Sequence, residues 1–501
     1  MSLGQYARNV GMLVGQSFVQ RVLGMVTTIV LARTLGATNF GVYSVVTATS
    51  NSAYGLVRLG VDAAIHVHTA EGFGDAATRQ RMRELLAAGF LMLVFAGGVG
   101  GLGCLVLGER LAVAIYEKPE LAVWIRVAGI AVFMQCLSQF FYATLVGLHC
   151  FSEYARVMVA SAVLSVAAIS LGALAAGLTG AVAALIAVQA VTVGWLGIVM
   201  RAALRKENLR LAFRNTAAHT KSLLVFGFPF YVSGLISIPV VYVLQGMVVR
   251  HAGLEELGYL RAIMAFVAIV AFAPTSAAAA MISMFARTRA QEHGALAVRI
   301  VQNVRMILVF ALLMAAGVMV LLPWLIPLLF GAQYMPALGA ASVALVTAVL
   351  TAVSGVVSNA LLSARKVVPL FAITALQAII FLGFGSYFIP ALGLTGYLTA
   401  ELLGYLAALL VTLLATRPWL RANGVRLGRL IGAAPLFLIL ALYSVRLIAL
   451  PGVPSPVEAL AGFGILLLFL LWAYCAILEP GERDRVRRMT EAGAARIWKR
   501  S

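Results

Sequence analysis

Three charged side chains stand inside long apolar stretches of this chain. Arg21 lies in the first stretch, and Arg58 and Asp62 lie in the second. A charge at membrane depth costs several kcal/mol, so it usually faces water, a ligand or an opposite charge. These positions therefore indicate a net-cationic interior in apolar surroundings.

Polar residues accompany these charges at helical spacing. Residues that recur at steps of three and four lie on one face of a helix. In the second stretch, this series is Ser44, Thr47, Asn51, Tyr54, Arg58 and Asp62. A shorter series of the same kind in the first stretch is Ser17, Arg21, Gly24 and Thr28. Because the other faces are apolar and small, we expect two helices that line a shared polar, net-cationic interior.

Further polar groups inside apolar stretches extend the candidate site. We assign cationic cavity positions to Arg21, Arg58 and Arg261, and we assign cavity or coupling roles to Asp62, Asn51, Tyr54, Gln139, Gln245, Asn359 and Glu401. Asp62 follows Arg58 by one helical turn, where it either holds the guanidinium or releases it during a cycle. A closed pair with a purely structural role is the plain alternative. Interfacial anchoring is the alternative for Arg261, and a hydrogen bond to tyrosine is the alternative for Glu401.

Composition defines the class of protein. The 501 residues are 62% hydrophobic and only 11% charged, which is typical of a polytopic, all-α membrane protein. At about 20 apolar residues per span there is room for about fourteen helices. The four cysteines have no pairing or metal spacing, so we interpret them as packing residues. No catalytic triad, phosphate loop or metal-ligand set is apparent, and we expect neither an enzyme nor a cofactor.

Charge placement predicts the topology. We expect spans at 10–32, 41–63, 84–107, 121–147, 155–177, 180–202, 222–249, 258–282, 305–328, 336–363, 368–390, 394–416, 429–449 and 457–478. Most of the 37 Lys and Arg residues then fall on the side of the N-terminus, and the opposite loops hold only Arg33, Arg110, Lys118 and Arg250. The positive-inside rule therefore places both termini in the cytoplasm. The net charge of +19 is spread between spans, which excludes a nucleic-acid-binding face.

The chain also repeats itself. GLTG occurs at 177–180 and at 393–396, and RTLGATNFG at 33–41 matches RHAGLEELG at 250–258. The shifts of 216 and 217 span six predicted helices, an even number, so the two copies have the same orientation. We therefore expect two six-helix lobes, 1–210 and 211–420, as parallel repeats around a central cavity. Helices 13 and 14 (421–478) and a basic cytoplasmic tail (479–501) follow. For this hairpin, packing beside the second lobe, lining a lipid groove and binding a partner all stay open.

Several motifs resemble a known family. LARTLGATNFGVYSVVTA, the following RLGVDAA, and LLFGAQYMPAL at 328–338 are similar to segments of the Wzx/PST-type polysaccharide flippases. These belong to the multidrug/oligosaccharidyl-lipid/polysaccharide exporter superfamily. The resemblance implies alternating access between two lobes, with translocation of an undecaprenyl-diphosphate-linked oligosaccharide from the cytoplasmic to the outer leaflet. It also implies a bacterial inner-membrane protein of surface polysaccharide (O-antigen or exopolysaccharide) biosynthesis.

Physical chemistry fits such a substrate. Guanidinium binds phosphate through two hydrogen bonds, so we assign the implied diphosphate to Arg21, Arg58 and Arg261. The polar stripes match the sugars, and the prenyl tail can remain among the membrane lipids. We expect a functional monomer, with polysaccharide polymerase or assembly proteins as candidate partners. Coupling to H+, Na+ or the membrane potential stays open.

Competing functions are a peptidoglycan-precursor (lipid II) flippase, a cation-coupled multidrug exporter and an enzyme of polysaccharide assembly. The peptidoglycan-precursor group resembles this chain in having cavity arginines in helices 1, 2 and 8. Paired intramembrane carboxylates would favour the exporter, and large outer loops would favour the enzyme.

Overall fold

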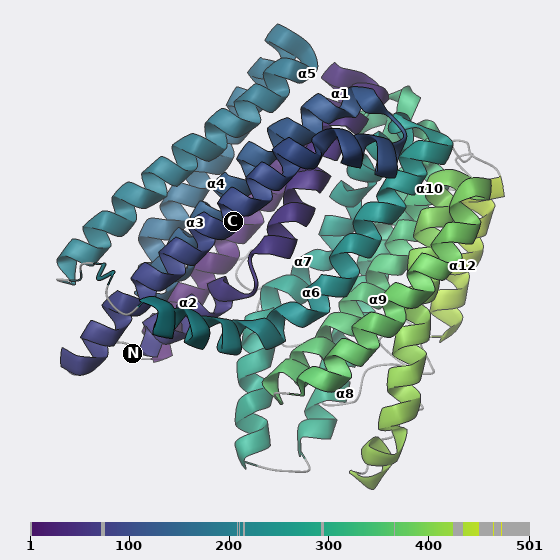
Figure 1. Ribbon diagram of the computed structural model, residues 1–501. Coiled ribbons are helices and arrows are strands. Elements are labelled where there is room, and N and C mark those ends of the chain that lie inside the picture. Colours follow the sequence, from purple (N-terminus) through teal and green to yellow (C-terminus); the bar gives the residue numbers. More distant parts are fainter. Residues whose placement is uncertain are drawn as a thin grey trace, which may run out of the picture. The chain divides into compact units, whose positions relative to one another are not determined.

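The computed structural model describes residues 3–71, 76–207, 209, 211–213, 216–291, 295–364, 366–423 and 434–449, with Gly464 and Trp472. All regular elements in these ranges are helices (Figure 1). They are α1 (Leu3–Val57), α2 (Val61–Glu71), α3 (Ala76–Tyr116), η1 (Pro119–Leu121), α4 (Ala122–Gly147), α5 (Phe151–Lys206), α6 (Thr216–Ala252), α7 (Leu254–Gln291), α8 (Ala295–Leu329), η2 (Ala332–Ala337), α9 (Leu338–Ser363), α10 (Val367–Ala422) and α12 (Ala434–Ala449). The all-α fold class is confirmed.

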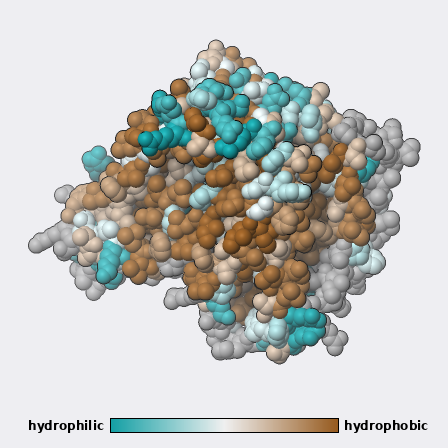
Figure 2. All heavy atoms as spheres, turned by 45° about the vertical axis from the view of Figure 1, so that its right-hand side comes forward, coloured by the Kyte–Doolittle hydropathy of each residue, from teal (hydrophilic) through white to brown (hydrophobic). Residues whose placement is uncertain are grey.

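Apolar helices of membrane length dominate the described residues. Eight are long and apolar enough to cross a bilayer. Large apolar side chains lie exposed on them, such as Phe95 at 73% and Ile198 at 70%. Figure 2 shows apolar side chains over most of the described part of one face, with hydrophilic ones gathered toward its margins. Exposed apolar surface on this scale fits a lipid environment rather than water.

Glycine turns divide the longest helices. At 1.5 Å per residue, the 56 residues of α5 would extend about 84 Å, against about 30 Å of hydrocarbon. The chain reverses at Gly177, whose φ of 59° suits glycine, and a side chain at Gly180 would collide with the carbonyl oxygen of Gly172. α5 is therefore a hairpin of two spans. α1 has a comparable break at Gly36.

The same turn recurs in α10. Gly393 has φ of 54°, and a side chain at Gly396 would collide with the carbonyl oxygen of Phe388. Gly396 and Phe388 lie 216 residues after Gly180 and Gly172, and 216 is also the shift between the two GLTG sequences. Equivalent positions of the sequence repeat thus have equivalent backbone geometry. The lobe boundaries at 210 and 420 stay a prediction.

With these breaks, the described helices cover the predicted spans from 10–32 to 394–416, with the span 41–63 interrupted after Val57, and α12 covers 434–449 of the predicted span 429–449. The predicted span 457–478 lies outside the described residues apart from Gly464 and Trp472, as does the tail at 479–501. The number of fourteen spans is therefore untested.

The chain forms two compact units. The first comprises residues 1–265, 329–337 and 367–404, and the second comprises 266–328, 338–366 and 405–501. One core of the first unit joins α2, α3, α4 and α6 through Ile65, Leu86, Phe140 and Leu223, which are all fully buried.

The second unit has its own core and its own polar contact. Phe285 of α7 and Val356 of α9 are fully buried together. Ser342 of α9 and Ser444 of α12 share a buried hydrogen bond of 2.7 Å between their hydroxyl groups. The predicted helix 13, which is α12, thus packs against α9.

Candidate ligand site in the first unit

The candidate site lies where α1 gives way to α2. α1 ends at Val57 and α2 begins at Val61, with positive φ at Leu59 (50°) and Gly60 (72°). The expected uninterrupted helix over 41–63 is therefore wrong. Glycine adopts positive φ readily, and a side chain at Gly60 would collide with the carbonyl of Gly227 in α6. The break thus allows a close approach of two backbones.

Arg58 and Asp62 face each other across this break. Arg58 Nη1 donates to Asp62 Oδ2 at 3.1 Å, and Gln139 Nε2 of α4 donates to the same oxygen at 3.3 Å. The guanidinium carbon of Arg58 lies 5.7 Å from the ring centroid of Tyr54. The Asp62 side chain is 11% exposed, whereas that of Arg58 is 36% exposed. The carboxylate is thus enclosed, and the arginine side chain that it binds is partly exposed.

Unused hydrogen-bonding capacity remains in this pair. Arg58 Nε and Asp62 Oδ1 are both buried, and neither has a hydrogen-bond partner among the described residues. Buried polar atoms are normally paired, so such atoms call for an explanation. A ligand that moves the guanidinium would allow a different pairing.

An amide pair continues the polar surface along α1. Gln135 Nε2 donates to Asn51 Oδ1 at 3.2 Å, and Asn51 is exposed. Gln135 and Gln139 are one turn apart on α4, so the helix presents two amides to α1 and α2. Gln135 is absent from the predicted site, although its four-residue spacing from Gln139 is the signal that indicates it. Amides of this kind can both donate to and accept from sugar hydroxyls.

The remaining predicted site residues lie on the first part of α1 and on other helices. Arg21 is half-buried on α1 before the break at Gly36, and Arg261 is exposed on α7. Gln245 on α6, Asn359 on α9 and Glu401 on α10 are partly buried. Asn359 belongs to the second unit. A single cavity shared by the three arginines, and the role of every residue in this set, stay predictions.

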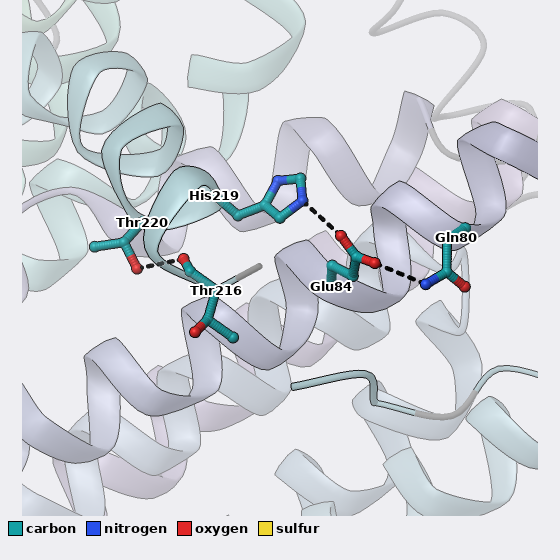
Figure 3. Close-up of polar contacts among 5 residues, drawn as sticks. All are labelled: Gln80, Glu84, Thr216, His219 and Thr220. Carbon is teal, nitrogen blue, oxygen red and sulfur yellow. Dashed lines mark hydrogen bonds and ion pairs between the residues drawn. The ribbon is translucent and has the colours of Figure 1, made fainter. Parts of the chain in front are cut away.

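A second polar cluster ties α3 to α6 near their N-terminal ends (Figure 3). His219 Nε2 lies 3.0 Å from Glu84 Oε2, and Gln80 Nε2 donates to Glu84 Oε1 at 2.7 Å. Glu84 is only 8% exposed, and each of its carboxylate oxygens has a polar partner. The sequence does not predict this contact, because His219 and Glu84 are 135 residues apart and no spacing rule joins them.

Comparison with solved structures defines the class. An inward-facing multidrug resistance MATE family transporter of the MOP superfamily has a TM-score of 0.70, with 16% identity over 81% of this chain and 95% of that one. The lipid II flippase MurJ in an inward closed conformation has a TM-score of 0.68, with 13% identity over 92% and 98%. An outward-facing MATE transporter gives 0.58, with 17% identity over 84% and 96%. The chain therefore has the fold of these polytopic membrane transporters.

The family model described as "Polysaccharide biosynthesis protein" matches residues 6–289, more than half of the 501 residues, and the chain belongs to that family. The resemblance to the polysaccharide flippases is thereby confirmed at the level of the family. No curated protein matches the chain.

Proposed function

We propose that this protein is a flippase that moves a polyprenyl-diphosphate-linked oligosaccharide from the cytoplasmic to the outer leaflet by alternating access. The observation that carries the proposal is the partly exposed side chain of Arg58, which donates to the enclosed carboxylate of Asp62 at 3.1 Å inside a membrane fold. The family match to polysaccharide biosynthesis supports the sugar component. The transporter fold supports movement of the lipid rather than its chemical conversion.

The geometry supports an exchange mechanism for the site. A diphosphate brings more negative charge than Asp62, and guanidinium binds phosphate through two parallel hydrogen bonds. Arg58 would turn from Asp62 to the diphosphate, while Gln139 continues to satisfy the carboxylate at 3.3 Å. On release of the lipid, Asp62 would recapture Arg58 and reset the site.

The neighbouring groups suit the rest of the substrate. Asn51 and Gln135 would hydrogen-bond the first sugars, and Arg21 and Arg261 would supply further phosphate contacts. The prenyl chain would remain in the bilayer beside the exposed apolar helix faces. The proposal includes a bacterial inner-membrane location, cytoplasmic termini, a monomeric unit and a role in surface polysaccharide assembly.

A lipid II flippase is the second candidate, because MurJ shares the fold over 92% of this chain. Both substrates carry a polyprenyl diphosphate, so Arg58 would serve either one. They differ in the headgroup, which is a peptide-bearing disaccharide in lipid II. Competition between the two headgroups for the purified protein would decide between them.

The test in cells uses a strain that depends on this transporter for surface polysaccharide. Arg58→Gln should reduce surface polysaccharide at least tenfold, and Arg58→Lys should restore part of it, because Lys keeps the charge without the planar fork. Arg126→Gln is the matched control, since Arg126 pairs with Glu109 at a similar 3.2 Å outside the site. Wild-type polysaccharide in an Arg58→Gln strain with normal protein levels would refute the role of Arg58.

A further inference from the structure

Two arginines on the predicted outer side stand at equivalent places in the sequence repeat. Arg33 and Arg250 are 217 residues apart, and each precedes a matching glycine turn. Outer loops of membrane proteins tend to lack basic residues, so cations that remain there have another purpose.

Each arginine bonds a helix end in the opposite repeat. Arg33 Nε donates to the carbonyl oxygen of Leu329, the last residue of α8, at 2.8 Å. Arg250 Nη2 donates to the carbonyl oxygen of Ala114, in the last turn of α3, at 2.6 Å. The spans in α3 and α8 are the third and ninth predicted helices, which are equivalent in the repeat. The last carbonyls of a helix lack intrahelical partners and carry partial negative charge, so a cation is favoured there.

Contacts between the two turns that follow these arginines, 33–41 and 250–258, have the same reciprocity. Thr38 Oγ1 donates to Glu255 Oε1 at 2.9 Å, and these residues are themselves 217 apart. A side chain at Gly41 would collide with the carbonyl of Leu254, and one at Gly258 would collide with the carbonyl of Ala37.

These two glycine contacts are also related by a shift of 217. When residue i contacts j and the equivalent of i contacts the equivalent of j, a two-fold axis passes between them. All of these residues belong to the first compact unit.

We propose that Arg33 and Arg250 form a two-fold outer clasp, together with the Thr38–Glu255 contact, that closes the outer ends of the two repeats and opens to release cargo. Opening as a step of transport rests on the proposed function. The clasp suits repeated opening, because Arg33 is exposed and the Arg250 side chain is 30% exposed. Water can therefore replace each carbonyl acceptor when the ends separate. Arg250 also has a carboxylate partner, Glu117 Oε1 at 3.1 Å, which belongs to the first repeat as well.

Crosslinking tests whether the clasp must open. Thr38→Cys and Glu255→Cys are introduced into a full-length variant whose native cysteines are replaced, and a short cleavable bis-thiol reagent joins them. Flipping of a fluorescent polyprenyl-diphosphate oligosaccharide in proteoliposomes should fall at least tenfold and recover when the linker is cleaved. The control pair is Glu109→Cys with Arg126→Cys, which lies within the first repeat, and its crosslinking should leave flipping within twofold. Full flipping by the crosslinked Thr38–Glu255 pair would overturn the proposal.

A second measurement needs no substrate. Arg33→Gln with Arg250→Gln removes both charged donors, so the outer side should open more often. Labelling of Asn51→Cys by a membrane-impermeant thiol reagent from the outer side should then accelerate about tenfold, while Arg126→Gln leaves the rate unchanged. Equal rates in the double variant and its parent would contradict the clasp. If labelling responds while no polyprenyl-diphosphate lipid is moved, the clasp stands and the proposed cargo fails.

Discussion

Replacing Asp62 by Asn should tighten binding of a diphosphate, because in the proposed exchange Asp62 competes with the ligand for Arg58. Asn keeps the shape of the side chain and a carbonyl oxygen but removes the negative charge. At 3.1 Å the attraction between two unit charges is about 1.3 kcal/mol in water and about 5 kcal/mol at an effective dielectric constant of 20. Since the Arg58 side chain is 36% exposed, the value near the lower limit applies. About 1.4 kcal/mol corresponds to a tenfold lower Kd.

The assay is equilibrium binding of a short-chain polyprenyl-diphosphate sugar to the full-length protein in nanodiscs. Turnover should fall in the same variant, because the ligand leaves a stronger site without the carboxylate that reclaims Arg58. Glu109→Gln is the matched control, since it removes the partner of Arg126 at 3.2 Å and should leave Kd unchanged. An unchanged or higher Kd in the Asp62→Asn protein, with wild-type thermal stability, would refute the exchange mechanism.

Three further predictions concern stability. Gly60→Ala should lower the free energy of unfolding by about 2 kcal/mol or more in thermal unfolding, because positive φ and a backbone collision both oppose a side chain there. Gly98 has open space around it, so the control Gly98→Ala should change this free energy little. His219→Ala should destabilise the protein by about 1–3 kcal/mol by leaving the buried Glu84 carboxylate with one fewer partner, and Glu84→Gln in the same chain should restore part of the loss in chemical denaturation. Burial raises the pKa of Glu256, just outside the predicted span 258–282, although a backbone hydrogen bond acts in the opposite direction. A carboxyl group whose pKa is higher in the folded than in the unfolded protein destabilises the fold once the pH exceeds its unfolded-state pKa. Glu256→Gln should therefore raise the melting temperature at pH 8 and not at pH 4.

Local rules predicted much of the fold. Apolar stretches of membrane length predicted the helices, and the two GLTG sequences marked the turns at Gly177 and Gly393 that the structure shows. The break at Gly60 was missed, because the polar series on α1 continues across it with helical spacing from Arg58 to Asp62. Gly60 is the local signal for a helix end, but only the structure shows that it lies against Gly227, a residue distant in sequence.

The candidate site could be predicted only in part. The pairing of Arg58 with Asp62 follows from their spacing, and the structure confirms the contact at 3.1 Å. The third member, Gln139, comes from another helix, so its bond to Asp62 depends on tertiary packing. Whether Arg21 and Arg261 share a cavity with Arg58 depends on the arrangement of whole helices, which side-chain periodicity does not encode.

Reconstituted lipid transport gives the most direct test of the central claim that Arg58 binds and carries a diphosphate headgroup across the bilayer. The measurement is the initial rate at which purified protein in proteoliposomes moves a fluorescent polyprenyl-diphosphate oligosaccharide between leaflets. We predict rapid movement by the native chain, a rate at least tenfold lower for Arg58→Gln, and the native rate for Arg126→Gln. Equal rates for Arg58→Gln and the native protein would contradict the account.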